Sequence, residues 1–318
     1  MKQLFGFGKR YSKFQRMSFP FIYLMILLPV VQFAIFWVGV NASSIKLAFQ
    51  DGFGEFTFNN FDRVFQAFSG KSSDYDLGAS LGRSFTIWVI STFVCFPIGL
   101  VTTYILYRKI FGHYVFRVCY IIPSLMGAIM WVSLMQYMMQ YDGFVVETLV
   151  KWGVDIPENA RRNGLLGAEE TAFPSLLIIH LLMGMAGNNA VLTGAFSRIP
   201  EELYESAELD GAGFWTVCFQ IAIPCIWSTI TTLLVFGLCG IFTGDINVFL
   251  YSNGTGEPGM STIGFVLYKM TYDISLAGGS TVDYGYPAAV GVVLTLVTLP
   301  IVLVGRWGLE KIQDAVEV

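Results

Sequence analysis

Six stretches of the sequence are apolar for long enough to cross a lipid bilayer, and this feature limits the fold more than any other. A helix needs about 20 apolar residues to span the hydrocarbon core. Backbone groups in that core cannot bond to water, so each stretch is expected to be helical. The sequence therefore predicts an all-α polytopic membrane protein with six transmembrane helices. They run over residues 19–40, 84–107, 116–139, 173–193, 217–242 and 286–306.

The composition supports a bilayer as the surroundings of the chain. Apolar residues make up 54% and charged residues 13% of the 318 residues, and soluble domains usually carry about 25% charged residues. The formal net charge of −4 provides no basic surface for a nucleic acid. We therefore expect contact with lipid and no nucleic-acid partner.

Lysine and arginine predict the orientation. With the N-terminus placed inside, the short inner segments carry eleven of the 19 basic residues, and the longer outer loops carry the rest. The positive-inside rule then places both termini in the cytoplasm. The inner loop that begins at Arg198 is an exception, because its one arginine is followed by five acidic residues.

The sequence predicts no catalytic residues, no metal site and no bound cofactor. Gly70, Lys71 and Ser72 resemble the end of a phosphate-binding loop, but Phe65 stands where that loop needs a glycine. The two histidines are far apart, and His180 lies in the fourth apolar stretch, where we expect it to bridge helices. This chain itself is therefore not expected to bind ATP.

The acidic inner loop has the pattern of a short amphipathic helix. Pro200 and the acidic residues after it suit a helix start, and Gly211 suits a helix end. A helix lying in the membrane interface is the alternative, but such helices are normally rich in lysine, and this one has none. We expect a cytoplasmic helix that docks in a cleft of a partner protein.

This loop resembles the EAA loop of binding-protein-dependent ABC importer permeases. Its lead-in, Ile199 to Tyr204, is similar to the pattern of the carbohydrate branch. The roughly 80 residues before the second span resemble the larger, MalF-like permease type of that branch. Three groups within the loop, residues 198–224, carry the resemblance: Glu205-Ser206-Ala207, Asp210-Gly211-Ala212 and Ile221-Ala222-Ile223-Pro224.

The resemblance implies a type I ABC importer permease fold in a bacterial plasma (inner) membrane. It implies a cytoplasmic basic N-terminus (1–18), a first transmembrane helix (19–40), an extracytoplasmic loop (41–83), a permease core of five transmembrane helices (84–306) and a cytoplasmic tail (307–318). The implied partners are a second homologous permease, two ATP-binding cassette ATPase subunits that bind and hydrolyse the ATP, and an extracytoplasmic sugar-binding protein.

The resemblance also implies how residues couple ATP hydrolysis to alternating access. Glu205 would meet a basic residue in the ATPase cleft, Ala207 would permit close approach, and Asp210 with Gly211 would set the turn. The residues implied in coupling are Glu205, Ser206, Ala207, Asp210, Gly211 and Pro224.

The expected function is import of a sugar or oligosaccharide. A neutral sugar needs hydrogen-bonding groups and apolar faces without a counter-charge. Candidates for the substrate pathway are Asn188, Asn189, Thr243 and Asp245, for which hydrogen bonds between helices are the alternative role. The alternative functions are an ABC permease for a peptide, an amino acid or another small solute, and a membrane interaction protein that transports nothing.

Overall fold

The computed structural model describes residues 13–69, 76–109, 112–242, 248–252, 259–276 and 283–316. Thr243, Asp245 and the segment from Gly70 to Ser72 lie outside the described residues. Within the described residues the chain is helical, and its extended pairing is limited to a single bridge between Gln50 and Phe56. The all-α class predicted from the sequence is confirmed.

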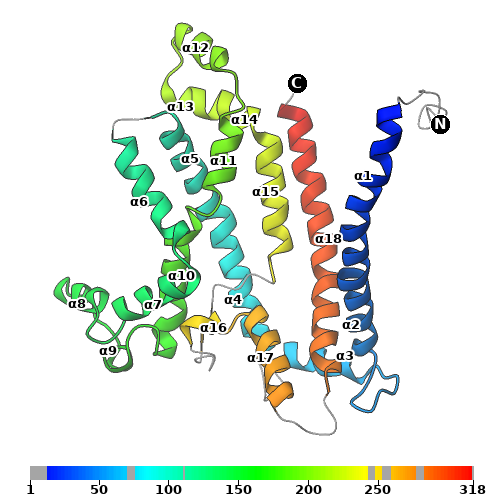
Figure 1. Cartoon of the computed structure of the whole chain (residues 1–318). Coiled ribbons are helices and arrows are strands. Elements are labelled where there is room, and N and C mark those ends of the chain that lie inside the picture. The colour runs from blue at the N-terminus through cyan, green and yellow to red at the C-terminus, as the bar shows by residue number, and fades with distance from the viewer. Residues whose placement is uncertain are drawn as a thin grey trace.

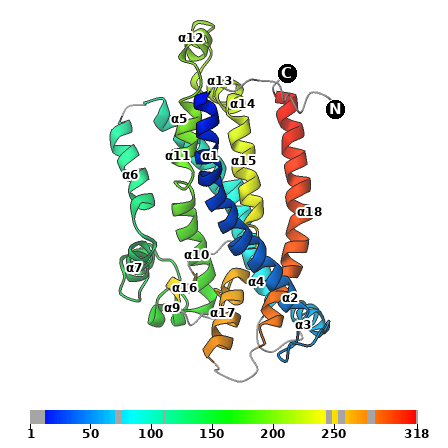
Figure 2. The same ribbon diagram turned by 45° about the vertical axis from the view of Figure 1, so that its right-hand side comes forward.

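The helices run side by side between two ends of an elongated bundle (Figure 1). One end, called here the α12 end, holds the short helix α12 (Glu201–Leu209) together with the start of α1 (Lys13–Gln32) and the end of α18 (Gly285–Val316). Figure 2 shows the same grouping after a rotation. The opposite end holds the short helices α3 (Asn59–Phe68), α8 (Phe144–Lys151), α9 (Glu158–Asn163), α16 (Val248–Tyr251) and α17 (Ile263–Leu276).

Four helical stretches of the described residues are long and apolar enough to cross a membrane. They are Tyr23–Ala48, Leu77–Tyr107, Glu169–Phe196 and Gly285–Ile312, and a bent pair brings the number to five. The first combines α1, a π-helical segment η1 (Phe33–Gly39) and α2 (Val40–Ala48). The second combines α4 (Leu77–Ile90), η2 (Ser91–Cys95) and α5 (Phe96–Tyr107), and the third α10 (Glu169–Gly184) and α11 (Asn189–Phe196).

The predicted count of six spans is not confirmed, because the stretch 116–139 is divided. Its two helices are α6 (His113–Leu125) and α7 (Ala128–Met138). Between them Met126 and Gly127 have extended backbone, with ψ angles of 135° and 146°. Extended residues cannot continue the helical hydrogen bonds, so neither helix alone has the length of a span.

The fifth apolar stretch begins across the α12 end of the bundle (Figure 1). Its first part consists of α13 (Phe214–Val217), η3 (Cys218–Ala222) and α14 (Ile223–Cys225). The chain then bends by 72° into α15 (Trp227–Cys239). Ile226 lies at the bend with φ −105° and ψ 13°, two residues after Pro224.

At the opposite end, the segment after the first span is fastened to the start of the last one. Asn60 is buried on α3 and donates hydrogen bonds from Nδ2 to the carbonyls of Ala48 (3.2 Å) and Gln50 (2.8 Å). Arg63 pairs with Asp283 at 2.7 Å and lies 4.5 Å from the centre of the Tyr286 ring. These contacts hold the first and last spans together at this end.

Candidate functional site

Helix α12 projects beyond the rest of the bundle between the fourth and fifth apolar stretches (Figures 1 and 2). Pro200 precedes its first residue in extended conformation, with ψ 135°. Glu201 and Glu202 occupy the first turn, where negative charge interacts favourably with the positive end of the helix dipole. The short helix predicted in this loop is therefore present, with these two acids at its start.

The C-terminal turn of α12 depends on Gly211. This residue has φ +78°, a left-handed conformation that glycine adopts at low cost. The N–H of Gly211 bonds to the Glu208 carbonyl at 3.1 Å, and the N–H of Ala212 bonds to the Ala207 carbonyl at 2.9 Å. This pair of bonds is the Schellman arrangement, which satisfies the last carbonyls of a helix.

One face of α12 packs against the chain itself. Tyr204 and Ala207 are only 2% and 7% exposed, and both belong to a core cluster that includes Tyr104 of α5 and Phe196 of α11. Arg108, directly after α5, forms an ion pair with Glu208. Ala207 was expected to allow a partner to approach closely, and the structure places it against this chain's own spans.

The other face of α12 is open at the end of the bundle. Glu205, Ser206 and Asp210 are exposed, and Leu209 is 89% exposed. Glu205 has no ion-pair partner within the described part of the chain. The exposed face therefore presents free carboxylates beside one leucine, which is suited to a partner surface with basic and apolar groups.

A cavity of about 220 Å³ lies inside the bundle where the second, fourth and fifth stretches meet. Its walls include Ser91 and Thr92 of η2, His180 of α10, and Asn188 just before α11, and the other side is closed by leucines of α15. Ser91 Oγ and His180 Nε2 lie 2.6 Å apart and share a hydrogen bond. The expected helix-bridging role of His180 is therefore confirmed.

The fourth span is interrupted beside this cavity. α10 ends at Gly184 and α11 begins at Asn189, and the residues between them form turns. The Met185 carbonyl accepts a hydrogen bond from the Tyr120 hydroxyl of α6. Broken helices at membrane depth are tolerated where other protein groups satisfy the freed backbone, and they place polar groups next to a solute route.

Two of the four residues predicted for the substrate pathway, Asn188 and Asn189, lie among the described residues, and they have different surroundings. Asn188 lines the cavity. Asn189 begins α11, and its Oδ1 accepts a hydrogen bond from Thr193 at 3.2 Å. Ser91 and His180 lie at the same cavity but were not among the predicted pathway residues, because their meeting depends on a contact between positions 89 residues apart.

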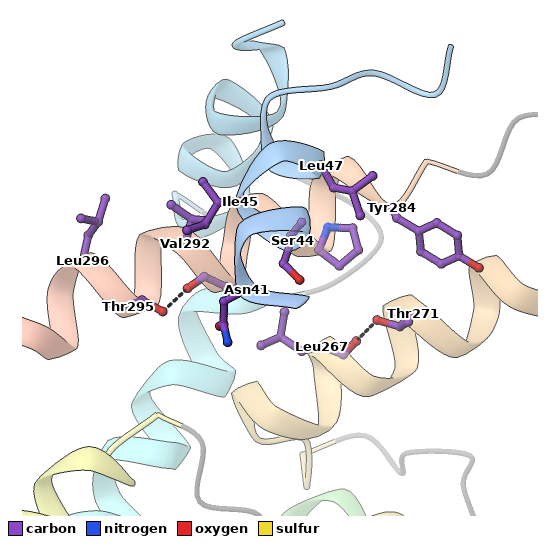
Figure 3. A pocket seen from close by; sticks show the side chains of 13 residues that line it. Asn41, Ser44, Ile45, Leu47, Leu267, Thr271, Tyr284, Val292, Thr295 and Leu296 are labelled. Atoms are coloured by element: carbon purple, nitrogen blue, oxygen red, sulfur yellow. Dashed lines mark hydrogen bonds between the residues drawn. The ribbon is translucent and has the colours of Figure 1, made fainter. Parts of the chain in front are cut away.

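A second cavity, of about 580 Å³, lies toward the opposite end between α2, α17 and α18 (Figure 3). Two of its hydroxyl groups are used within their own helices: Thr271 donates to the Leu267 carbonyl and Thr295 to the Gly291 carbonyl. Asn41 likewise donates to the Trp37 carbonyl. With most of its polar groups engaged, this cavity is the weaker candidate for a polar solute.

The sequence model of a family described as "Binding-protein-dependent transport system inner membrane component" matches residues 95–317. The match covers more than half of the chain and includes α12 and the walls of the inner cavity apart from Ser91 and Thr92. The chain belongs to this family. It is accordingly a multi-pass protein of a family of inner membrane components.

Curated relatives share parts of the chain. NgcF, a diacetylchitobiose uptake system permease protein of Streptomyces coelicolor, is 28% identical over 185 residues, which cover 57% of this chain and 48% of NgcF. AglF, an alpha-glucoside transport system permease protein of Rhizobium meliloti, is 33% identical over 135 residues, covering 41% and 36%. MalF, a maltose/maltodextrin permease protein of Escherichia coli K12, is 29% identical over 131 residues, covering 40% and 25%. The chain thus spans about half or less of the length of these relatives.

Solved structures confirm the fold. A chain of a bacterial alginate ABC transporter, crystallised with an alginate pentasaccharide-bound periplasmic protein, superposes with a TM-score of 0.74 at 22% identity, covering 96% of this chain and 99% of that one. A second structure of a bacterial alginate importer gives a TM-score of 0.73, also at 22% identity, and covers 93% and 97%. The type I permease fold expected from the sequence therefore extends over nearly the whole chain.

Proposed function

We propose that the chain is a permease subunit of an ATP-driven, binding-protein-dependent importer for a sugar or oligosaccharide. The observation that carries the proposal is α12, a short acidic helix held at one end of the bundle with its carboxylates exposed. In a family of binding-protein-dependent transport components, such a helix is suited to receive force from a partner.

The choice of a sugar rests on the relatives and on the cavity. The names of NgcF, AglF and MalF all refer to saccharides. The inner cavity is lined by the Asn188 amide, the Thr92 hydroxyl and the hydrogen-bonded pair of Ser91 and His180, beside apolar walls, which suits a neutral polyhydroxylated solute. A peptide or amino acid permease remains the alternative, and a solute panel would distinguish it.

The proposed assembly contains this chain, a second homologous permease, two ATPase subunits and an extracytoplasmic sugar-binding protein. Glu205, Ser206 and the turn at Asp210 and Gly211 would form the surface that docks on an ATPase. Ala207 and Pro224 would act from the inner side, Ala207 by packing α12 on the spans and Pro224 beside the bend of the fifth stretch. ATP hydrolysis would reside in the partner, and closure of the ATPases would turn the cavity outward.

Labelling from the two sides of the membrane tests the proposed orientation, in which the α12 end faces the cytoplasm. Single cysteines at Glu55 and Ser206, both exposed, are introduced after replacing the five native cysteines. In intact cells an impermeant maleimide is expected to label position 55 and to label position 206 only after permeabilisation. Labelling of both positions in intact cells would contradict the proposal.

Two substitutions test the function, one expected to impair sugar uptake and the other expected to impair docking of the ATPase. Asn188→Ala removes a cavity amide and is expected to lower sugar uptake while the ATPase still co-purifies with the chain. Glu205→Ala is expected to weaken ATPase docking by about one to two powers of ten, because a charge-assisted contact contributes roughly 1.5–3 kcal/mol. The measurements are co-purification of the ATPase and uptake of a labelled saccharide panel in vesicles.

Thr232→Ala provides the control, because Thr232 lies on α15 outside the cavity lining and its hydroxyl donates to the Ser228 carbonyl of its own helix. It should retain both uptake and assembly. If Asn188→Ala transports as well as this control, the cavity is not part of the route. Normal assembly of Glu205→Ala would remove Glu205 from the docking surface.

A further inference from the structure

Arg108 connects α12 to the second span through two contacts of a single side chain. Its guanidinium forms an ion pair with Glu208, 100 residues later in the sequence. The same group lies 4.8 Å from the centre of the Tyr204 ring. Tyr204 and Glu208 are four residues apart and therefore lie on the same side of the helix, so one arginine holds a full turn of α12.

Aromatic contacts extend this connection into three other helices. The Tyr204 ring lies 6.4 Å from Tyr107 of α5, which lies 5.9 Å from Phe196 of α11. Tyr104 of α5 lies 5.4 Å from Phe196 and 5.2 Å from Phe214 of α13. The backbone joins α12 to the fourth and fifth stretches, whereas these side chains join it to the second.

We propose that Arg108 is a positioning residue that ties α12 to α5, so that the second span moves together with α12. The coupling part of this inference rests on the proposed function, because a partner ATPase is what would move α12. The contacts of Arg108 with Glu208 and Tyr204 lie within this chain and do not depend on a partner. Since Ser91 and Thr92 of the inner cavity lie on the same span as α5, movement of this span changes the cavity wall.

The two contacts depend on the chemistry of arginine. An exposed ion pair alone contributes little, but the Arg108 side chain is only 26% exposed, and its planar guanidinium can stack on a ring while it pairs with a carboxylate. Lysine would keep the charge with weaker stacking. We therefore expect Arg108→Ala to weaken the tie by about threefold to tenfold, and Arg108→Lys by less.

Electron paramagnetic resonance on the whole chain in nanodiscs tests the tie without any partner. Spin labels on Ser206→Cys and Lys109→Cys report the separation of α12 from the end of α5, in a background without the native cysteines. A single narrow distance distribution is expected, which Arg108→Ala broadens. The exchanged pair Arg108→Glu with Glu208→Arg keeps the ion pair but removes the guanidinium from position 108, so it should restore the narrow distribution in part. Arg306→Ala, which removes an ion pair with Glu310 on α18, should leave it unchanged.

The coupling role is measured on the complex purified through a tag on this chain and reconstituted in vesicles. Arg108→Ala is expected to keep its ATPase but to transport about threefold to tenfold less sugar per ATP hydrolysed, and the exchanged pair should recover part of this loss. Glu205→Ala is instead expected to weaken the docking of the ATPase.

Each contrary result overturns a definite part of the inference. An unchanged distance distribution in Arg108→Ala would mean that the tie does not exist. A broadened distribution with an unchanged ratio of transport to hydrolysis would make Arg108 structural only. A parent chain that co-purifies with no ATPase would overturn the proposed function and the coupling role together, while the distance measurement would still decide whether the tie exists.

Discussion

Replacing Gly211 with proline is expected to weaken ATPase docking by about a hundredfold. Proline fixes φ near −65°, whereas Gly211 has φ +78°, so the turn that ends α12 has to reorganise. Proline also lacks the N–H that bonds to the Glu208 carbonyl at 3.1 Å. A penalty of roughly 3 kcal/mol corresponds to about two powers of ten. Co-purification of the ATPase measures the effect.

Gly213 offers a closely matched control for this prediction. It has an ordinary φ of −72°, and a methyl group on it would meet nothing within 4 Å. Gly213→Ala should therefore keep its ATPase. Gly211→Ala also meets nothing within 4 Å, so its expected intermediate effect would come only from the left-handed backbone. If Gly211→Pro assembles and hydrolyses ATP normally, this turn does not shape the docking surface.

Replacing Gly99 with alanine is expected to destabilise the bundle by about 2 to 3 kcal/mol, near the upper end of the usual cost of overpacking. A methyl group at this position would lie 2.5 Å from the Met185 carbonyl oxygen and 3.4 Å from its carbon. Because both are backbone atoms, the clash cannot be relieved by the movement of a side chain. Leucine at this position should prevent accumulation of folded protein. The apparent melting temperature in detergent measures the effect.

Gly82 is the control on the same membrane-spanning stretch. A methyl group there meets nothing within 4 Å, and alanine favours a helix over glycine by up to about 1 kcal/mol. Gly82→Ala should therefore melt at the same temperature as the parent or slightly higher. Equal melting temperatures for Gly82→Ala and Gly99→Ala would show that the second and fourth spans do not approach as closely as the structure indicates.

Hydropathy predicted the fold class because the thickness of the bilayer alone requires long apolar helices. Hydropathy could not predict where these helices are interrupted, because it averages side-chain properties and does not describe the backbone. Met126 and Gly127 are extended within an apolar stretch. The break after Gly184 lies against Gly99 and receives the hydroxyl of Tyr120, and neither contact can be read from the local sequence.

Some parts of the candidate site could be predicted from the sequence and others could not, because only some of them depend on local sequence signals. Helix α12 was recognisable because its start and end signals are local, from Pro200 to Gly211. The sequence predicted an amphipathic helix, but an amphipathic pattern does not tell whether the apolar face meets the chain itself or a partner. The contact of Arg108 with Glu208 joins positions 100 residues apart, so it could be found only in the folded structure.

The length of the first span has a consequence for the membrane around it. Tyr23–Ala48 contains 26 residues, all exposed except Ala48 at its end. At 1.5 Å per residue it is about 39 Å long, against roughly 30 Å of hydrocarbon. Its last turn is fastened to α18 through the contacts of Asn60 and Arg63, so the end near Lys13 is the one free to swing. A thinner bilayer would increase the tilt of this arm and leave the remaining helices in place.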